Sequence, residues 1–161
     1  MATVADKVAR RVEEHYPHVL GLAGAAMMLV FGPNLMTSAA ANGWHLDQLY
    51  AALFNLSTVF TGFLFTFYSF VVTADRGFLA QARQSIYLQR ANGFTIVAIT
   101  AGFILCVLSI PTLVWQPAPI VRNLEMVWLS VWVGTSVWAL LAFERATRLF
   151  IIFASRHKGS Q

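Results

Sequence analysis

Charged residues and cysteine are scarce in this sequence of 161 residues. Asp, Glu, Lys and Arg together make up 11% of the chain, whereas 58% of it is apolar. A soluble domain usually carries about 25% charged residues, so a soluble fold of this size would have too little polar surface. The same balance excludes intrinsic disorder. Because Cys106 is the single cysteine, an internal disulfide and a multi-cysteine metal site are excluded as well. The sequence therefore predicts an integral membrane protein.

The sequence contains long stretches without charged residues. Each of four such stretches is long enough for the about 20 residues that a bilayer-spanning helix requires. We expect transmembrane helices at about 19–40, 49–72, 93–114 and 124–143. These spans leave no room for a separate soluble domain. The expected fold class is an all-α integral membrane protein, a single domain over 1–161 whose four transmembrane helices form an antiparallel bundle.

The basic residues predict how these helices are oriented. Ten of the eleven Lys and Arg residues lie before the first span, between the second and third spans, or after the fourth, and Arg122 is the exception. Cytoplasmic segments retain Lys and Arg, so we expect both termini in the cytoplasm of a multi-pass protein of the plasma (inner) membrane. The sequence pI of about 9.7 is then explained by this topology and by contact with the lipid bilayer. It requires no nucleic-acid partner.

The first span has a second interpretation as a cleavable signal peptide. Basic residues, an apolar run and the small residues at 38–41 are typical of such a peptide. The apolar run is longer than the roughly 7 to 15 residues of a signal h-region, which favours a permanent span. Cleavage would leave three spans and move the new N-terminus outside.

Short amphipathic extensions are predicted on the cytoplasmic side. Valines recur every four residues among charged side chains in 1–17, as in a surface helix, and we expect Pro17 to begin the first span. A frayed, charged tail is the other interpretation of this segment. In 144–161 an apolar face continues beyond Glu144 and Arg145, so the fourth helix is expected to emerge from the bilayer. We expect the second and third helices to project beside it as a short bundle, which predicts a docking surface for a cytoplasmic protein or for copies of the same chain.

Small and polar residues form one stripe along the second span, which is otherwise rich in phenylalanine. Steps of three or four place them on one face of a helix: Asn55, Thr58, Gly62, Thr66, Ser69 and Thr73. Such a face avoids lipid. It indicates either close helix packing or a water-filled path lined by hydroxyl groups. Packing is favoured, because serine and threonine hydroxyls bond readily to the preceding helical turn.

Pairs of small residues predict contact faces on the other spans. The first span has Gly21 and Ala25, and the fourth has Ser130 and Gly134. A spacing of four residues lets two helix backbones approach closely. The third span has a longer run of the same kind, formed by Thr95, Ala98, Gly102, Cys106 and Ser109.

Pro33 and Asn34 interrupt the first span. Proline removes one helical hydrogen bond and leaves a carbonyl that needs another donor, so we expect a kink. Asn34 and Asn55 lie at similar depth if the first two spans form a hairpin. A hydrogen-bonded staple between them is the structural interpretation, and a solute site is the functional one.

Ionisable residues are missing from the middle of every predicted span, which argues against proton-coupled transport. The nearest acid, Glu144, is expected at the cytoplasmic interface, where Arg148 lies one helical turn later and can pair with it. The four histidines lie at or outside the interfaces. We therefore predict no haem, no metal site and no other cofactor.

Two hypotheses for function remain. The first is a non-catalytic, homo-oligomeric tetraspan subunit that forms a pore or docks a cytoplasmic partner. The alternative is a small membrane-embedded enzyme that acts on a lipid or lipophilic substrate, with an anionic cosubstrate bound by Arg83, Arg90 and Asn92. The first is preferred, because the sequence contains no recognisable catalytic motif.

Overall fold

The structure is a computed structural model that describes residues 4–73, 86–115 and 123–157. These parts of the chain form four helices: α1 (Val4–Ala41), α2 (Leu46–Thr73), α4 (Ile86–Trp115) and α5 (Asn123–His157). Each helix is long and apolar enough to cross a membrane. The all-helical fold with four candidate spans is therefore confirmed.

The candidate spans differ from the predicted ones mainly at their ends. They cover His15–Ala41, Leu46–Ser69, Ala91–Val114 and Leu124–Leu149, so the largest difference is at the end of the fourth span. α5 is one unbroken helix of 35 residues, about 52 Å long at 1.5 Å per residue. It exceeds a hydrocarbon core of about 30 Å, as expected from the apolar face that continues past Glu144. Residues 158–161 of the predicted extension lie outside the described parts of the chain.

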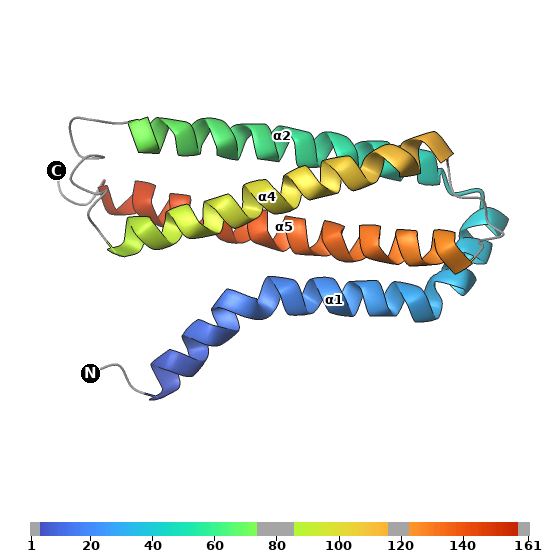
Figure 1. Cartoon of the computed structure of the whole chain (residues 1–161), viewed down its shortest axis with the longest axis horizontal. Helices are drawn as coiled ribbons and strands as arrows, with labels where there is room; N and C mark the ends of the chain where they lie inside the picture. The colour runs from blue at the N-terminus through green and yellow to red at the C-terminus, as the bar shows by residue number, and fades with distance from the viewer. Residues whose placement is uncertain (1–3, 74–85, 116–122, 158–161) are drawn as a thin grey trace.

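The start of α1 departs from the sequence-based expectation. The helix begins at Val4 and continues through both Pro17 and Pro33, whereas the sequence predicted a helix boundary at Pro17. An internal proline removes a hydrogen bond and bends a helix without having to end it. Figure 1 shows α1 bent near both of its ends.

A glycine cap ends α1 and directs the chain into α2. Gly43 has a φ of 64°, a left-handed conformation that glycine adopts without steric cost. The Trp44 N–H donates to the Ala39 carbonyl at 2.9 Å, and the Gly43 N–H donates to the Ala40 carbonyl at 3.2 Å. This pair of bonds is a Schellman motif, which satisfies carbonyls at the end of a helix.

The helices pack in the order α1, α5, α4 and α2, with a minor contact between α2 and α5. α1 packs mainly on α5, although the chain runs from α1 directly into α2. The starts of α1 and α4 and the ends of α2 and α5 lie at one end of the molecule (Figure 1), which we call the Arg145 end because Arg145 lies near the end of α5.

Small residues fill the contact between α4 and α5. Ala98, Ala101 and Ala139 are fully buried, so these two backbones lie close together. The indole N–H of Trp132 on α5 donates to the hydroxyl of the buried Ser109 on α4 at 2.9 Å. The small-residue face predicted for the third span is thus a contact face.

Candidate functional site

The predicted polar stripe of α2 lies on the outer surface of the structure. A Cβ atom built on Gly62, in the middle of the stripe, would meet no atom within 4 Å. Ser69 is half-buried, and the other members are exposed: Asn55, Thr58, Gly62, Thr66 and Thr73. At one edge of the stripe, the Thr58 hydroxyl lies 3.4 Å from the Cys106 sulfur of α4. The stripe therefore borders the contact between α2 and α4 at Thr58, and most of it is exposed.

The face of α2 that packs on α4 lies on the other side of the helix. Tyr50, Ser57 and Leu64 are all at most 3% exposed. At 3.6 residues per turn, these three side chains lie about 140° around the helix from the middle of the stripe. The Ser57 hydroxyl lies 3.2 Å from the Cys106 sulfur of α4. The orientation of the stripe is therefore fixed by this opposite, buried face.

The threonine hydroxyls of the stripe have acceptors on their own helix. Thr58 donates to the Phe54 carbonyl at 2.9 Å, and Thr66 donates to the Gly62 carbonyl at 2.8 Å. Thr73 donates to the carbonyl of Ser69 at 2.7 Å. The stripe therefore needs no water to satisfy these donors.

Asn34 and Asn55 lie on helices that pack against different partners. Asn34 lines a groove of about 540 Å³ between α1 and α5, whereas Asn55 belongs to α2, which packs mainly on α4. Next to Pro33, the hydroxyl of Thr37 lies 3.0 Å from the carbonyls of both Pro33 and Asn34. No hydrogen bond links the two asparagine side chains in the part of the chain that the structure describes.

The predicted anion contact near the start of α4 lies largely outside the described residues. Arg83 falls in 74–85, and the side chain of Arg90 is not among those described. Asn92 is half-buried near the start of α4.

α1 meets α5 through the small residues that the sequence predicted. A Cβ built on Gly134 would lie 2.7 Å from the Cβ of Ala25, and one built on Gly21 would lie 2.9 Å from the Cβ of Trp138. Such distances leave no room for a side chain at either glycine. Ser130, one turn before Gly134, is also buried. The two small-residue pairs are therefore confirmed as contact faces.

Arg145, which the sequence places among the basic residues after the fourth span, is buried in the structure. Only 8% of it is exposed, and its guanidinium carbon lies 3.3 Å from the centre of the Phe94 ring on α4. The sequence did carry a signal for this burial. Ala139, Ala142 and Ala146 repeat at helical spacing and are all buried, so the close-packed face of α5 continues past Arg145.

A second polar contact links α1 to α5 at the Arg145 end. Glu144 forms the predicted ion pair with Arg148. The hydroxyl of Tyr16 on α1 donates to the other carboxylate oxygen of Glu144 at 3.4 Å. Tyr16 of α1 and the Glu144–Arg148 pair of α5 therefore form a polar contact between the two helices at this end.

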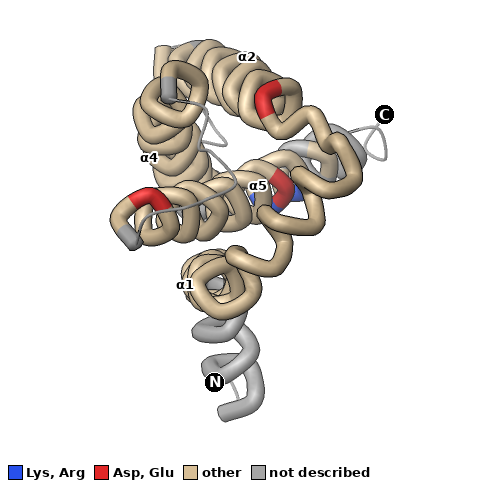
Figure 2. Tube along the Cα trace, turned by 90° about the vertical axis from the view of Figure 1, so that its right-hand side faces the viewer, with Lys and Arg blue, Asp and Glu red and all other residues tan. Residues whose placement is uncertain are grey.

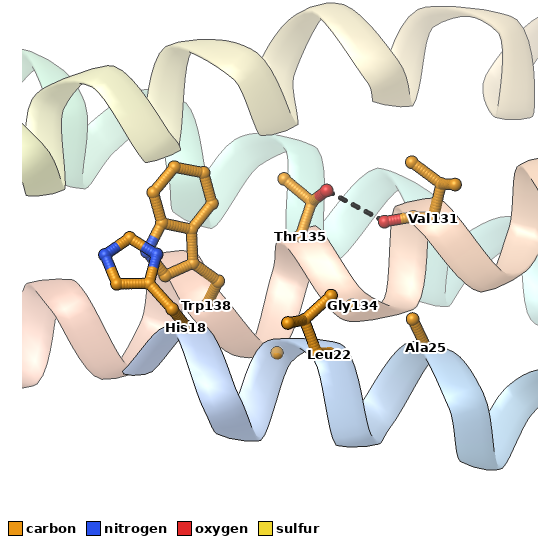
Figure 3. Close-up of a pocket in the computed structure, with 8 residues that line it drawn as sticks. His18, Leu22, Ala25, Val131, Gly134, Thr135 and Trp138 are labelled. Atoms are coloured by element: carbon orange, nitrogen blue, oxygen red, sulfur yellow. Dashed lines mark hydrogen bonds between the residues drawn. The ribbon is translucent and has the colours of Figure 1, made fainter. Parts of the chain in front are cut away.

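A groove of about 340 Å³ follows the contact between α1 and α5 (Figure 3). The imidazole ring of His18 lies beside the indole of Trp138, with ring centres 5.1 Å apart. The Thr135 hydroxyl is turned to the Val131 carbonyl at 2.8 Å, which leaves the lining mostly apolar. The lining consists of His18, Gly21, Leu22, Ala25, Val131, Gly134, Thr135 and Trp138.

Metal chemistry finds no support in the described ranges, where no three His, Cys, Asp or Glu residues are grouped to hold an ion. Comparison of the chain with family models, with curated proteins and with solved structures found no match. The geometry of the α2 stripe is therefore the basis for a functional proposal.

Proposed function

We propose that the chain is a multi-pass protein of the plasma (inner) membrane and a non-catalytic subunit of a homo-oligomer whose copies meet along the polar stripe of α2. The observation that carries this proposal is the direction of the stripe. Five of its six residues are exposed, and its middle lies about 140° around α2 from the buried face that packs on α4. Only its edge at Thr58 reaches Cys106 of α4 among the described contacts, so lipid or another copy would cover the rest.

The proposed topology is antiparallel, with the Arg145 end and both termini in the cytoplasm. The starts of α1 and α4 and the ends of α2 and α5 lie together at that end (Figure 1). The three basic segments of the sequence adjoin these helix ends. Retention of Lys and Arg in the cytoplasm supports this orientation.

Contact between copies suits the chemistry of the stripe better than contact with lipid. Small residues let two helices approach closely, and dispersion contacts between the helices then replace looser contacts with acyl chains. Gly62 offers such an approach at the middle of the stripe. Because Thr58 and Thr66 bond to their own helix, their hydroxyls can enter a dry interface without losing a hydrogen bond.

Oxidative cross-linking in native membranes tests this interface. Thr58→Cys and Thr66→Cys, each in a Cys106→Ala background, are expected to give disulfide-linked dimers because equivalent positions of two copies would face each other. Phe63→Cys is the matched control, since Phe63 is 63% exposed on the same helix but lies off the stripe. Equal cross-linking at all three positions, or a monomer in lipid nanodiscs, would contradict the proposal.

A pore lined by the stripe is the other form that this assembly could take. It requires the hydroxyls to face water along an axis. Thr66→Leu would then lower ion flux through reconstituted liposomes and leave the oligomer intact. If the stripe is instead a dry contact, the parent protein carries no flux, and the same substitution weakens the oligomer.

A further inference from the structure

Asn34 places a side-chain amide inside a candidate span. It lies on α1, seven residues before the end of the span His15–Ala41, which has 27 residues. This span is about 40 Å long at 1.5 Å per residue, so it extends about 5 Å past each edge of a hydrocarbon core of about 30 Å. Asn34 therefore lies about 5 Å inside the edge of the core, at the opposite end of the molecule from the Arg145 end.

The Asn34 side chain makes no hydrogen bond within the described parts of the chain. It is exposed, and the bond that the Thr37 hydroxyl donates beside it goes to the backbone carbonyl of Asn34. An amide without a partner costs free energy in hydrocarbon, because no water replaces the missing bond. We therefore expect another molecule to cover this amide.

The groove that Asn34 lines changes in polarity along α1. Ser38, which also lines it, lies one helical turn nearer to the end of the span. In the other direction the groove is lined by Phe31, Met27 and Gly24. Its polar end therefore lies near the membrane surface and its apolar end lies toward the middle of the bilayer. A lipid molecule has the same order of polarity.

The dimensions of the groove fit one acyl chain. Its volume of about 540 Å³ extends over about 21 Å from Gly24 to Ser38, which gives a mean cross-section of about 26 Å². A helix 10 Å across needs about 80 Å² and does not fit. From Asn34 to Gly24 the groove runs about 15 Å, which is half of a hydrocarbon core of about 30 Å and therefore the depth of one leaflet.

We propose that this groove binds one glycerophospholipid, with an ester carbonyl that accepts a hydrogen bond from the Asn34 amide and an acyl chain that runs along α1 to Gly24. The ester groups of a phospholipid lie where the acyl chains meet the headgroup, which matches the depth of Asn34. An ester carbonyl is neutral and enters the edge of the core, whereas the carboxylate of a free fatty acid would lose its hydration there. This site is separate from the stripe of α2 and does not depend on the oligomer.

Native mass spectrometry of the purified protein tests this site. The protein is titrated with dioleoyl phosphatidylcholine and, separately, with the diether lipid that has the same headgroup and chain length but no ester carbonyl. We expect the first ester lipid to bind about fivefold more tightly, the effect of one neutral hydrogen bond. Asn34→Leu should lower binding of the ester lipid to that of the diether lipid. Asn92→Leu, which removes a half-buried amide near the start of α4, should retain the preference.

Two further arms separate a phospholipid in the groove from other occupants. Met27→Trp fills the groove from a position that is 64% exposed and should weaken both lipids severalfold, whereas Ile110→Trp, at a 53% exposed position on α4, should not. Oleic acid should not displace the ester lipid at equal concentration. Equal binding of the two lipids, full binding to the Met27→Trp variant, or displacement by oleic acid would each overturn the proposal, even if Asn34→Leu fails to fold. A dimer that Asn34→Leu dissociates, with the ester preference unchanged, would also overturn it and assign Asn34 to a contact between copies.

Discussion

Gly21 of α1 and Gly134 of α5 lie directly against each other. A Cβ on Gly21 would lie 2.9 Å from the Gly134 carbonyl oxygen, and a Cβ on Gly134 would lie 2.8 Å from the Gly21 carbonyl oxygen. Each obstacle is backbone, which cannot rotate away as a flexible side chain can. Because α1 packs mainly on α5, this crossing controls how the first span joins the rest of the protein.

Substitution of either glycine at this crossing should therefore destabilise the protein. We expect Gly134→Ala to lower the free energy of unfolding by about 1–3 kcal/mol, the usual cost of overpacking a tight contact. Gly93→Ala is the matched control on α4, where a Cβ would meet no atom within 4 Å. In an open helical position alanine is favoured over glycine by about 1 kcal/mol, so the control should be neutral or stabilised. Thermal unfolding in detergent distinguishes the two, and equal stability of both variants would contradict this account.

The bond between Trp132 and Ser109 should contribute to stability at the contact of α4 with α5. Ser109→Ala leaves the buried indole N–H without its acceptor, and we expect a loss of about 1–3 kcal/mol. Thr100→Ala serves as the control, because Thr100 is exposed and its hydroxyl donates to the Ile96 carbonyl of the same helix. In a Trp132→Phe background, which has no indole N–H, Ser109→Ala should cost markedly less. Additive losses in this double-mutant cycle would contradict the coupling.

The proposed orientation makes a direct labelling prediction. His45→Cys lies in the connection between α1 and α2, and Arg148→Cys lies near the opposite end of the molecule, on α5. With Cys106 replaced by alanine, a membrane-impermeant maleimide should modify His45→Cys in intact spheroplasts. It should modify Arg148→Cys only after lysis, because the basic segments hold that end in the cytoplasm. The reverse pattern would mean that the orientation is wrong.

The sequence predicted best those features that depend on the residues of a single helix. Uncharged runs predicted the four candidate spans, because the length and polarity of a span are local properties. The small residues at Gly21, Ala25 and Gly134 predicted contact faces for a similar reason, since only small residues permit close backbone approach.

Features that depend on a neighbouring helix could not be predicted from the sequence of one helix. The burial of Arg145 requires Phe94, which lies on another helix and more than fifty residues earlier in the chain. The stripe of α2 was predicted as a set of residues on one face, but its direction is decided by how Tyr50 and Leu64 pack on the rest of the chain. Pro17 was misleading because its cyclic side chain favours a helix start, whereas α1 continues through it.

The contact between Arg145 and Phe94 should hold the Arg145 end together and keep the guanidinium group in place. Phe94→Leu removes the aromatic ring while keeping an apolar side chain, and we expect a loss of about 0.5–2 kcal/mol of stability, the range of a cation–π contact that is partly desolvated. Phe103→Leu on the same helix is the control, because Phe103 is exposed and away from the cation. Thermal unfolding in detergent measures this difference, and equal stability of the Phe94→Leu and Phe103→Leu variants would contradict a contribution from the contact between Arg145 and Phe94.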